Sequence, residues 1–221
     1  MAIKKKDFIE VEYTGKLKEE NLVFDTTDEK KAKEMGIHSK QQSYGPIVIC
    51  LGEGQILPGL EKEIEGKEPG EYTVDLQPED AFGKKDAKLI KMIPASAFRR
   101  QNINPEPGMQ VNIDGMMGII KTAAGGRCLV DFNHPLSGKE VSYTIKVTKI
   151  ITDDKEKAKS YLSLALNSKN LPVEVKEGKA IVATDKEVPK EIQETLSKKV
   201  KELIPALKEV VFKVKEKEKV K

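Results

Sequence analysis

The sequence contains no tryptophan, and it has only two cysteines and two histidines among its 221 residues. Cys50 and Cys128 lie far apart, and neither a CxxC motif nor a Cys/His cluster accompanies them. This scarcity excludes the common zinc sites, which need closely spaced Cys and His ligands. Two buried thiols in a reducing compartment explain the cysteine usage best, with a disulfide as the alternative.

Long apolar runs are also absent, although hydrophobic residues make up 38% of the chain. A membrane-spanning helix needs an apolar run of about 18 residues or more, so a membrane span is excluded. The N-terminal residues MAIKKKDFIEVEY are basic at first but lack the apolar core and cleavage site of a signal peptide. We therefore expect a cytoplasmic protein with no membrane partner.

Charge of either sign is in little excess, because 39 basic residues face 36 acidic ones and the net charge is +3. A nucleic-acid-binding protein usually carries a strongly basic face, so we expect no nucleic-acid partner. The length suffices for one large domain or for two to three small ones, each with its own core.

The N-terminal stretch, residues 1–83, alternates apolar and polar residues as β-strands do. The first elements expected here are a strand from Phe8 that turns at Thr14-Gly15, a returning strand over 22–24, and a short helix and loop over 28–45. They are followed by a strand over 47–51 that is buried on both faces, a helical turn that ends at Gly66, and a strand over 71–76.

The middle stretch, residues 84–129, differs in composition, because it contains four of the six methionines. The elements expected here are a strand over 89–94, a short helix capped by Ser96, and a hairpin of 109–113 with 118–121 around the turn signal Asp114-Gly115. Alternation resumes after it, with Val141, Tyr143, Ile145 and Val147 on one strand face.

The C-terminal stretch, residues 153–221, is predicted to be a separate α+β unit. The elements expected here are a helix from Asp153-Asp154, a hairpin turning at Glu177-Gly178, a helix after Pro189 that Pro205 kinks, and a strand over 210–214. The second helix repeats apolar residues at helical spacing and so has an apolar face: Ile192, Leu196, Val200, Leu203 and Leu207.

Three segments together resemble the FK506-binding-protein-type peptidyl-prolyl isomerases in order and spacing. They are VEYTG (11–15) followed by VFDTT (23–27), LGEGQILPGLE (51–61), and PEDAFG (78–83). A fourth segment, DFNHPLSGKEV (131–141), is similar to the D-x-N-H-P-L-A-G motif of the SlyD-type branch.

The resemblance covers about residues 3–152 and implies an α+β fold, with a half-wrapped antiparallel sheet over a short helix. Relatives of the SlyD type carry an extra domain in the flap of this fold. The implied isomerase domain is then 1–83 plus 130–152, and the implied insert is the mainly-β chaperone domain 84–129. The C-terminal α+β domain, 153–221, resembles the extension of long archaeal members.

The resemblance also implies a pocket that binds an X-Pro bond. Its residues, carried over by position, are Tyr13, Phe24, Asp25, Ile47, Ile56, Leu57, Leu60, Phe82 and Tyr143. Ile56 and Leu57 are expected to form its wall and Leu60 its floor. Many relatives have tryptophan at Leu60 and an aromatic residue at Ile47, and both departures argue against tight binding of macrolide drugs.

These pocket residues also have ordinary structural explanations, and Phe82 beside Gly83 suits a turn. Tyr13, Phe24 and Tyr143 at alternating strand positions suit a plain core. Asp25 before two threonines suits the start of a turn. His134 beside Pro135 is interpreted as a structural loop residue and not as a catalyst.

The methionine-rich insert allows two interpretations. Methionines fill gaps in small cores, and they also suit surfaces that meet many different chains. Relatives of the SlyD type bind unfolded chains through this insert, which favours the second interpretation. The residues expected to take part are Ile93, Phe98, Met109, Met116 and Met117.

The resulting prediction is a peptidyl-prolyl isomerase that accelerates folding and whose insert captures unfolded polypeptides with X-Pro bonds. A holdase with little isomerase activity is the alternative. The family needs no cofactor and no metal, and the metal handling of SlyD-type relatives is discounted because residues 153–221 contain neither Cys nor His. Because that unit is small and has an apolar helix face, we expect it to form a homodimer.

Overall fold

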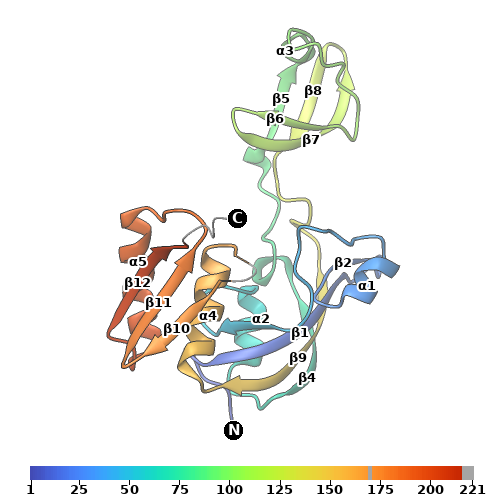
Figure 1. Ribbon diagram of the computed structural model, residues 1–221. Helices are drawn as coiled ribbons and strands as arrows, with labels where there is room; N and C mark the ends of the chain where they lie inside the picture. Colours follow the sequence, from blue (N-terminus) through green and yellow to red (C-terminus); the bar gives the residue numbers. More distant parts are fainter. Residues whose placement is uncertain (169–170, 216–221) are drawn as a thin grey trace. The chain divides into compact units, whose positions relative to one another are not determined.

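A computed structural model describes residues 1–168 and 171–215 of the chain (Figure 1). It contains two compact units, of which the first comprises Met1–Asp75 and Ser142–Lys221 and the second comprises Leu76–Val141. Both units combine strands with short helices, so the α+β class expected from the sequence is confirmed. No helix of the described residues is both long enough and apolar enough to span a membrane.

The N-terminal part of the first unit is a five-stranded sheet of order β2-β1-β9-β4, in which β3 also pairs with β1. Its elements are β1 (Phe8–Leu17), β2 (Val23–Thr26), α1 (Glu29–Glu34), β3 (Ile47–Cys50), α2 (Pro58–Ile64), β4 (Gly70–Leu76) and β9 (Val141–Ile151). Along β1 and β9 the apolar residues alternate with polar ones, which places one apolar face toward the core.

The first strand does not turn at Thr14-Gly15, so that prediction is wrong. β1 continues to Leu17, and the chain reverses after it, where the Leu17 N–H donates to the Leu22 carbonyl oxygen over 2.8 Å. The glycine instead marks a shift in register against β2, between Gly15 and Lys16. A glycine inside a strand is as typical of a bulge as of a turn, and the sequence alone does not separate the two.

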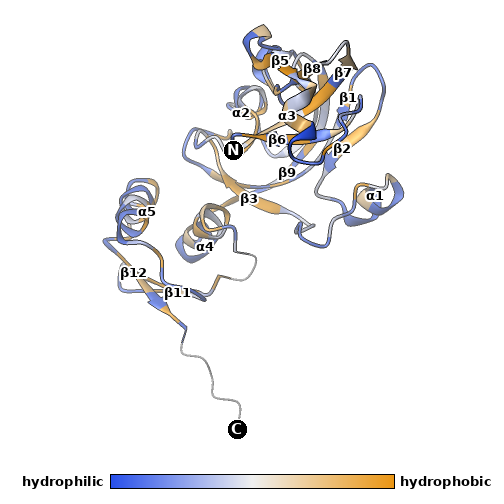
Figure 2. Cartoon of the chain, turned by 90° about the horizontal axis from the view of Figure 1, so that it is seen from above, coloured by the Kyte–Doolittle hydropathy of each residue, from blue (hydrophilic) through white to orange (hydrophobic). Residues whose placement is uncertain are grey.

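The C-terminal part of the first unit is a three-stranded sheet of order β10-β11-β12. Its elements are α4 (Asp154–Ala165), β10 (Val173–Lys176), β11 (Lys179–Thr184), α5 (Lys190–Leu203) and β12 (Glu209–Val214). β10 is antiparallel to β11, and β12 is parallel to it. α4 and α5 cover one face of this sheet (Figure 2).

Local sequence features predicted the positions of most of these C-terminal elements. The Asp153 side chain caps α4 by accepting from the Glu156 N–H over 2.7 Å. The hairpin turns at Glu177 and Gly178, which both have positive φ, as predicted. The predicted kink at Pro205 is wrong, because α5 already ends at Leu203; helices commonly end before a proline.

The C-terminal elements share one hydrophobic core with the five-stranded sheet. Phe8 and Cys50 of that sheet pack with Leu162 of α4 and Val200 of α5, and all four are buried. β3, which carries Cys50, is hydrophobic along its length (Figure 2). The apolar face of α5 is therefore covered within the chain itself, although Ile192 at its start remains exposed.

The second unit contains a four-stranded antiparallel sheet of order β5-β8-β7-β6. Its elements are two 3-10 helices (Pro78–Asp80 and Ala87–Leu89), β5 (Ile90–Pro94), α3 (Ala95–Arg99), β6 (Gln110–Ile113), β7 (Met116–Ala124) and β8 (Arg127–Asp131). The predicted hairpin at Asp114-Gly115 is confirmed, with φ of 52° and 82° at the two residues. Ser96 lies inside α3, whose N-cap is Pro94, so the predicted cap is wrong.

Candidate functional site

A bulge in β2 shapes the site. Gly15 is opposite Asp25 and Lys16 is opposite Val23, so Phe24 is the extra residue on β2. Neighbouring side chains of a regular strand point to opposite faces, whereas a bulge re-aims one of them. Both Phe24 and Asp25 consequently approach the same partner on β9, Tyr143.

Three aromatic rings meet on the apolar face of the sheet. The ring of Tyr143 lies 5.9 Å from that of Tyr13 and 5.8 Å from that of Phe24, and it meets the Phe24 ring edge-on. Such tilted and edge-to-face pairs are favourable arrangements of aromatic quadrupoles. Tyr143 is almost fully buried, whereas Tyr13 and Phe24 are half-buried. The cluster thus combines a fixed inner ring with two partly accessible ones.

Gly15 allows this packing. A Cβ atom at position 15 would lie 2.6 Å from Cζ and 3.0 Å from the hydroxyl oxygen of Tyr143. Carbon atoms in comfortable contact are about 3.5–4.0 Å apart, so no larger residue fits without moving the ring. Gly15 is therefore part of the site, although the sequence suggested only a turn.

Asp25 supplies the charge of the cluster. Burial raises the pKa of the Tyr13 hydroxyl, and the charge of Asp25 and a hydrogen bond to its carboxylate raise it further. Burial likewise raises the pKa of Tyr143, again with a contribution from Asp25. The Gln42 side chain reaches Asp25 from the loop after α1, with Nε2 3.5 Å from Oδ1. Both phenols therefore stay protonated, and the Asp25 carboxylate is engaged as an acceptor.

The segment LGEGQIL (51–57) joins β3 to α2, and we call it the rim loop. The Gln55 Oε1 accepts the Cys50 N–H over 2.7 Å. The Glu61 Oε1 accepts the N–H groups of Gly52 and Gly54, over 3.2 and 3.1 Å. Both glycines have positive φ, which other residues rarely adopt. One side chain of the loop and one of α2 thus hold the loop backbone.

The apolar residues of the rim loop stand at the start of α2. Ile56 and Leu57 are half-buried, and Leu57 is the N-cap residue. Leu60 is 1% exposed, as a floor residue would be. The first N–H groups of a helix lack partners within the helix, so a carbonyl group that approaches this end meets donors next to aliphatic side chains.

Ile47 shares the face of the aromatic cluster. It lies directly opposite Val11 in the pairing of β3 with β1, and residues that face each other across strands share a face. Tyr13 is two residues beyond Val11 and so is on this face too. The structure thus brings these predicted residues to one face of one sheet.

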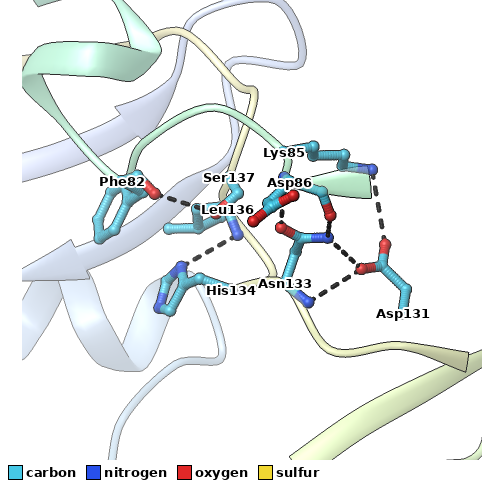
Figure 3. Close-up of polar contacts among 8 residues, drawn as sticks. All are labelled: Phe82, Lys85, Asp86, Asp131, Asn133, His134, Leu136 and Ser137. Atoms are coloured by element: carbon cyan, nitrogen blue, oxygen red, sulfur yellow. Dashed lines mark hydrogen bonds and ion pairs between the residues drawn. The ribbon is translucent and has the colours of Figure 1, made fainter. Parts of the chain in front are cut away.

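Phe82 belongs to the second unit and stacks there on His134. The two rings are 4.9 Å apart and almost parallel. The His134 Nδ1 accepts the Leu136 N–H over 3.2 Å, and the Ser137 hydroxyl donates to the Phe82 carbonyl oxygen over 3.0 Å (Figure 3). His134 is held as a structural loop residue, in the manner expected from the sequence.

Asn133 continues this network (Figure 3). Its Oδ1 accepts the Asp86 N–H over 2.8 Å, and its Nδ2 donates to the Asp86 carbonyl oxygen and to Asp131 Oδ1 over 3.0 and 2.8 Å. Burial would raise the pKa of Asp131, but the Asn133 hydrogen bonds and the nearby Lys85 outweigh it, and the pKa is lowered. The motif DFNHPLSG therefore fastens the chain segments that enter and leave the second sheet.

The residues expected to capture unfolded chains separate into two groups. Phe98 is 4% exposed and lies in the core of the second unit, and Ile93 and Met109 pack against that core. Burial removes Phe98 from the surface, whereas Ile93 and Met109 are only partly buried. Met116 and Met117 are 41% and 58% exposed. The sequence did not single out Met92, which is 61% exposed.

A cleft of about 590 Å³ lies in the first unit and shares Tyr13 with the aromatic cluster. Its lining residues are Glu12, Tyr13, Thr14, Thr27, Asp28, Glu29, Lys30, Lys31, Tyr44, Gly45, Glu71, Thr144 and Lys146. Most of its strand residues alternate with Tyr13 and Tyr143, so they face away from the aromatic cluster. Acidic and basic side chains both line this cleft, which distinguishes it from the aromatic cluster.

Metal chemistry has no visible basis among residues 1–168 and 171–215. No group of three or more His, Cys, Asp or Glu side chains in these ranges is arranged to hold a metal ion. Both cysteines are buried free thiols.

Comparison with known proteins identifies the family. Residues 1–99 match the FKBP-type peptidyl-prolyl cis-trans isomerases, and residues 91–136 match the family described as FKBP26, IF domain. A short-type peptidyl-prolyl cis-trans isomerase from Methanocaldococcus jannaschii is 37% identical over 146 residues, which cover 66% of this chain and 92% of the relative.

Bacterial relatives match a shorter part of the chain. SlyD from Vibrio cholerae is 33% identical over 48% of this chain and 54% of its own length. An FKBP-type 16 kDa isomerase from Escherichia coli is 34% identical over 48% of this chain and 74% of its own length. Together with the shared motifs and the aromatic cluster on the sheet, these matches show that the chain belongs to the FKBP-type peptidyl-prolyl cis-trans isomerase family.

Proposed function

We propose that this protein is a peptidyl-prolyl isomerase that accelerates the folding of other chains, and that its second unit binds the unfolded substrate. The observation that carries the isomerase assignment is the convergence of Tyr13, Phe24 and Tyr143 around the Asp25 carboxylate. The rim loop and α2 add the aliphatic residues Ile56, Leu57 and Leu60.

The chemistry requires little beyond such a surface. A prolyl bond rotates over a barrier of about 18–20 kcal/mol because resonance holds the peptide group planar. Rotation breaks the resonance and leaves a twisted, less polar bond, which an apolar and water-poor pocket favours over the planar form. Asp25 already accepts from Tyr13, so its role is to orient the phenol and not to attack the substrate.

Replacing Asp25 with alanine tests this assignment. We expect kcat/KM for a short X-Pro tetrapeptide to fall at least tenfold, because Tyr13 loses its acceptor and the pocket loses its charge. Glu12→Gln is the matched control, since Glu12 precedes Tyr13 on β1 and points to the other face of the sheet. Equal activity of the Asp25→Ala variant and the wild-type protein would refute the assignment.

Binding of unfolded chains is assigned to the second unit because it exposes methionines. Thioether side chains adapt to many partner shapes, and Met116 and Met117 are well exposed at the turn that joins β6 to β7. Tethering a captured chain near an isomerase site makes the second encounter intramolecular. Phe98 is not part of this proposal, because it is buried.

A proline-limited refolding assay separates an isomerase from a holdase. An isomerase accelerates the slow refolding phase, whereas a holdase slows it. We expect Met116→Ser combined with Met117→Ser to reduce catalysis on a folding protein while leaving tetrapeptide activity unchanged. Met35→Ser is the control, because Met35 is 50% exposed in the first unit. Equal losses on both substrates would contradict the separation of roles.

Two further expectations stay predictions. The buried free thiols support a reducing, cytoplasmic location. The expected homodimer through 153–221 rests on the apolar face of α5. Leu196, Val200 and Leu203 of that face are buried in the chain's own core. The apolar face of α5 is therefore not available for dimerisation. Light scattering at micromolar concentration tests the oligomeric state.

A further inference from the structure

The Glu53 side chain leaves the rim loop in the direction of the C-terminal helices. This side chain is only 13% exposed, which is low for a glutamate in a glycine-rich loop. Gln55 of the loop and Glu61 of α2 accept backbone N–H groups of Cys50, Gly52 and Gly54. Its partners come from elsewhere in the sequence.

Lys199 of α5 and Tyr161 of α4 supply those partners. The Lys199 Nζ lies 3.0 Å from Oε2 and 3.2 Å from Oε1 of Glu53, so it contacts both carboxylate oxygens. Tyr161 lies close enough to the same carboxylate to interact with its charge. Burial raises the pKa of Tyr161, and the negative charge of Glu53 raises it further. A largely buried carboxylate needs such pairing, since an unpaired one is costly.

Apolar packing makes this connection rigid. Cys50, at the end of β3 and three residues before Glu53, shares a core with Leu162 of α4 and Val200 of α5. Tyr161 packs against the same core. The C-terminal helices therefore cannot move far from the start of the rim loop without opening a hydrophobic core.

We propose that Glu53, Tyr161 and Lys199 form an anchor by which the C-terminal helices position the rim residues Ile56 and Leu57 for substrate binding. The three are positioning residues, because they act through the loop and not on the substrate. The proposal rests on the isomerase function proposed above. It gives the C-terminal part of the chain a role in the affinity of the isomerase for prolyl substrates.

The expected effect falls on KM more than on kcat. Without the anchor, the rim loop samples positions in which Ile56 and Leu57 do not meet the substrate. The apparent dissociation constant then rises in inverse proportion to the competent fraction, while the bound enzyme remains competent. Couplings between sites typically correspond to about 5- to 150-fold, so we expect KM to rise about fivefold or more.

Two substitutions that preserve packing test the anchor. Lys199→Met keeps the aliphatic stem, and Tyr161→Phe keeps the ring in the core. Both should raise KM for a short X-Pro tetrapeptide with kcat little changed, and Lys199→Arg should restore a KM near that of the wild-type protein. Lys6→Met is the matched control, because Lys6 pairs with Glu202 of α5 over 3.0 Å but lies outside the rim loop.

Amide hydrogen exchange of the full-length variants gives a readout that is independent of activity. Faster exchange at residues 52–57, with exchange in α2 unchanged, is the expected result. The proposal is overturned if both variants keep the wild-type KM and rim exchange, or if Lys6→Met raises KM equally. A wild-type protein without isomerase activity would instead refute the proposed function, so the two failures are distinguishable.

Discussion

Replacing Gly15 with alanine should damage the isomerase site more than the fold. The new Cβ would lie 2.6 Å from Cζ and 2.7 Å from a neighbouring ring carbon of Tyr143. Comfortable carbon contacts need about 3.5–4.0 Å, so the ring must shift by about 1 Å. Tyr143 is buried and in contact with Tyr13 and Phe24, so the shift disturbs the whole cluster.

The stability cost follows from two opposing effects. Overpacking of a well-packed core costs about 1–3 kcal/mol. The smaller conformational freedom of alanine in the unfolded chain returns about 0.4–1 kcal/mol. We expect a net loss of about 1–2 kcal/mol in the free energy of unfolding. A misplacement of about 1 Å at a catalytic site costs up to about 100-fold in rate, so kcat/KM should fall about 10- to 100-fold.

Urea unfolding and tetrapeptide isomerisation measure the two effects separately. Gly70→Ala is the matched control, because its Cβ would meet only the hydroxyl end of the Tyr72 side chain, at 3.2 Å. Combining Gly15→Ala with Tyr143→Val should recover part of the stability, because removing the Tyr143 ring relieves the clash. It should recover none of the activity, because that ring is part of the site. Wild-type kcat/KM in the Gly15→Ala variant would refute the reasoning.

Four further outcomes follow from the same structure. Phe98→Ala should destabilise the second unit by about 3–5 kcal/mol in urea unfolding and leave tetrapeptide activity intact, because Phe98 is buried in that unit's own core. The lowered pKa of Asp131 stabilises the folded state at pH values above about 3.9, the ordinary pKa of an aspartate side chain, and this stabilisation is lost as the pH falls through the pKa of the folded state. The stability of the Asp131→Asn variant should therefore lack this dependence on pH in acid unfolding. Asn133→Ala should speed hydrogen exchange in residues 82–89, since it removes both bonds to Asp86. Because the pKa values of Tyr13 and Tyr143 are raised, kcat/KM should stay flat through pH 10, and a fall with a midpoint near 10 would contradict the buried phenol pair.

Local features of the fold could be predicted from the sequence because their causes are local. Asp114-Gly115 and Glu177-Gly178 form turns since the backbone there needs positive φ, and short loops offer few alternatives. Asp153 caps α4 because its carboxylate reaches N–H groups within one turn. The joint spacing of the motif segments likewise predicted the family, which the comparisons confirm.

The candidate site could be predicted only as a set of residue types. Tyr13 and Tyr143 were placed on strand faces by alternation, but their contact depends on which strands pair. Gly15 is interpreted from the sequence as a turn, whereas its contact with the Tyr143 ring depends on the pairing of β1 with β9. Periodicity reports the face of an element and not the partner opposite it.

By itself, the sequence determined the class of fold, most element positions and the family, because propensity, alternation and turn chemistry act over a few residues. Only the tertiary structure decided that Phe98 is buried and that Glu53 pairs with Lys199, 146 positions later in the chain. Such contacts arise when whole elements pack to exclude water. The sequence around either residue does not predict which distant residue it will contact.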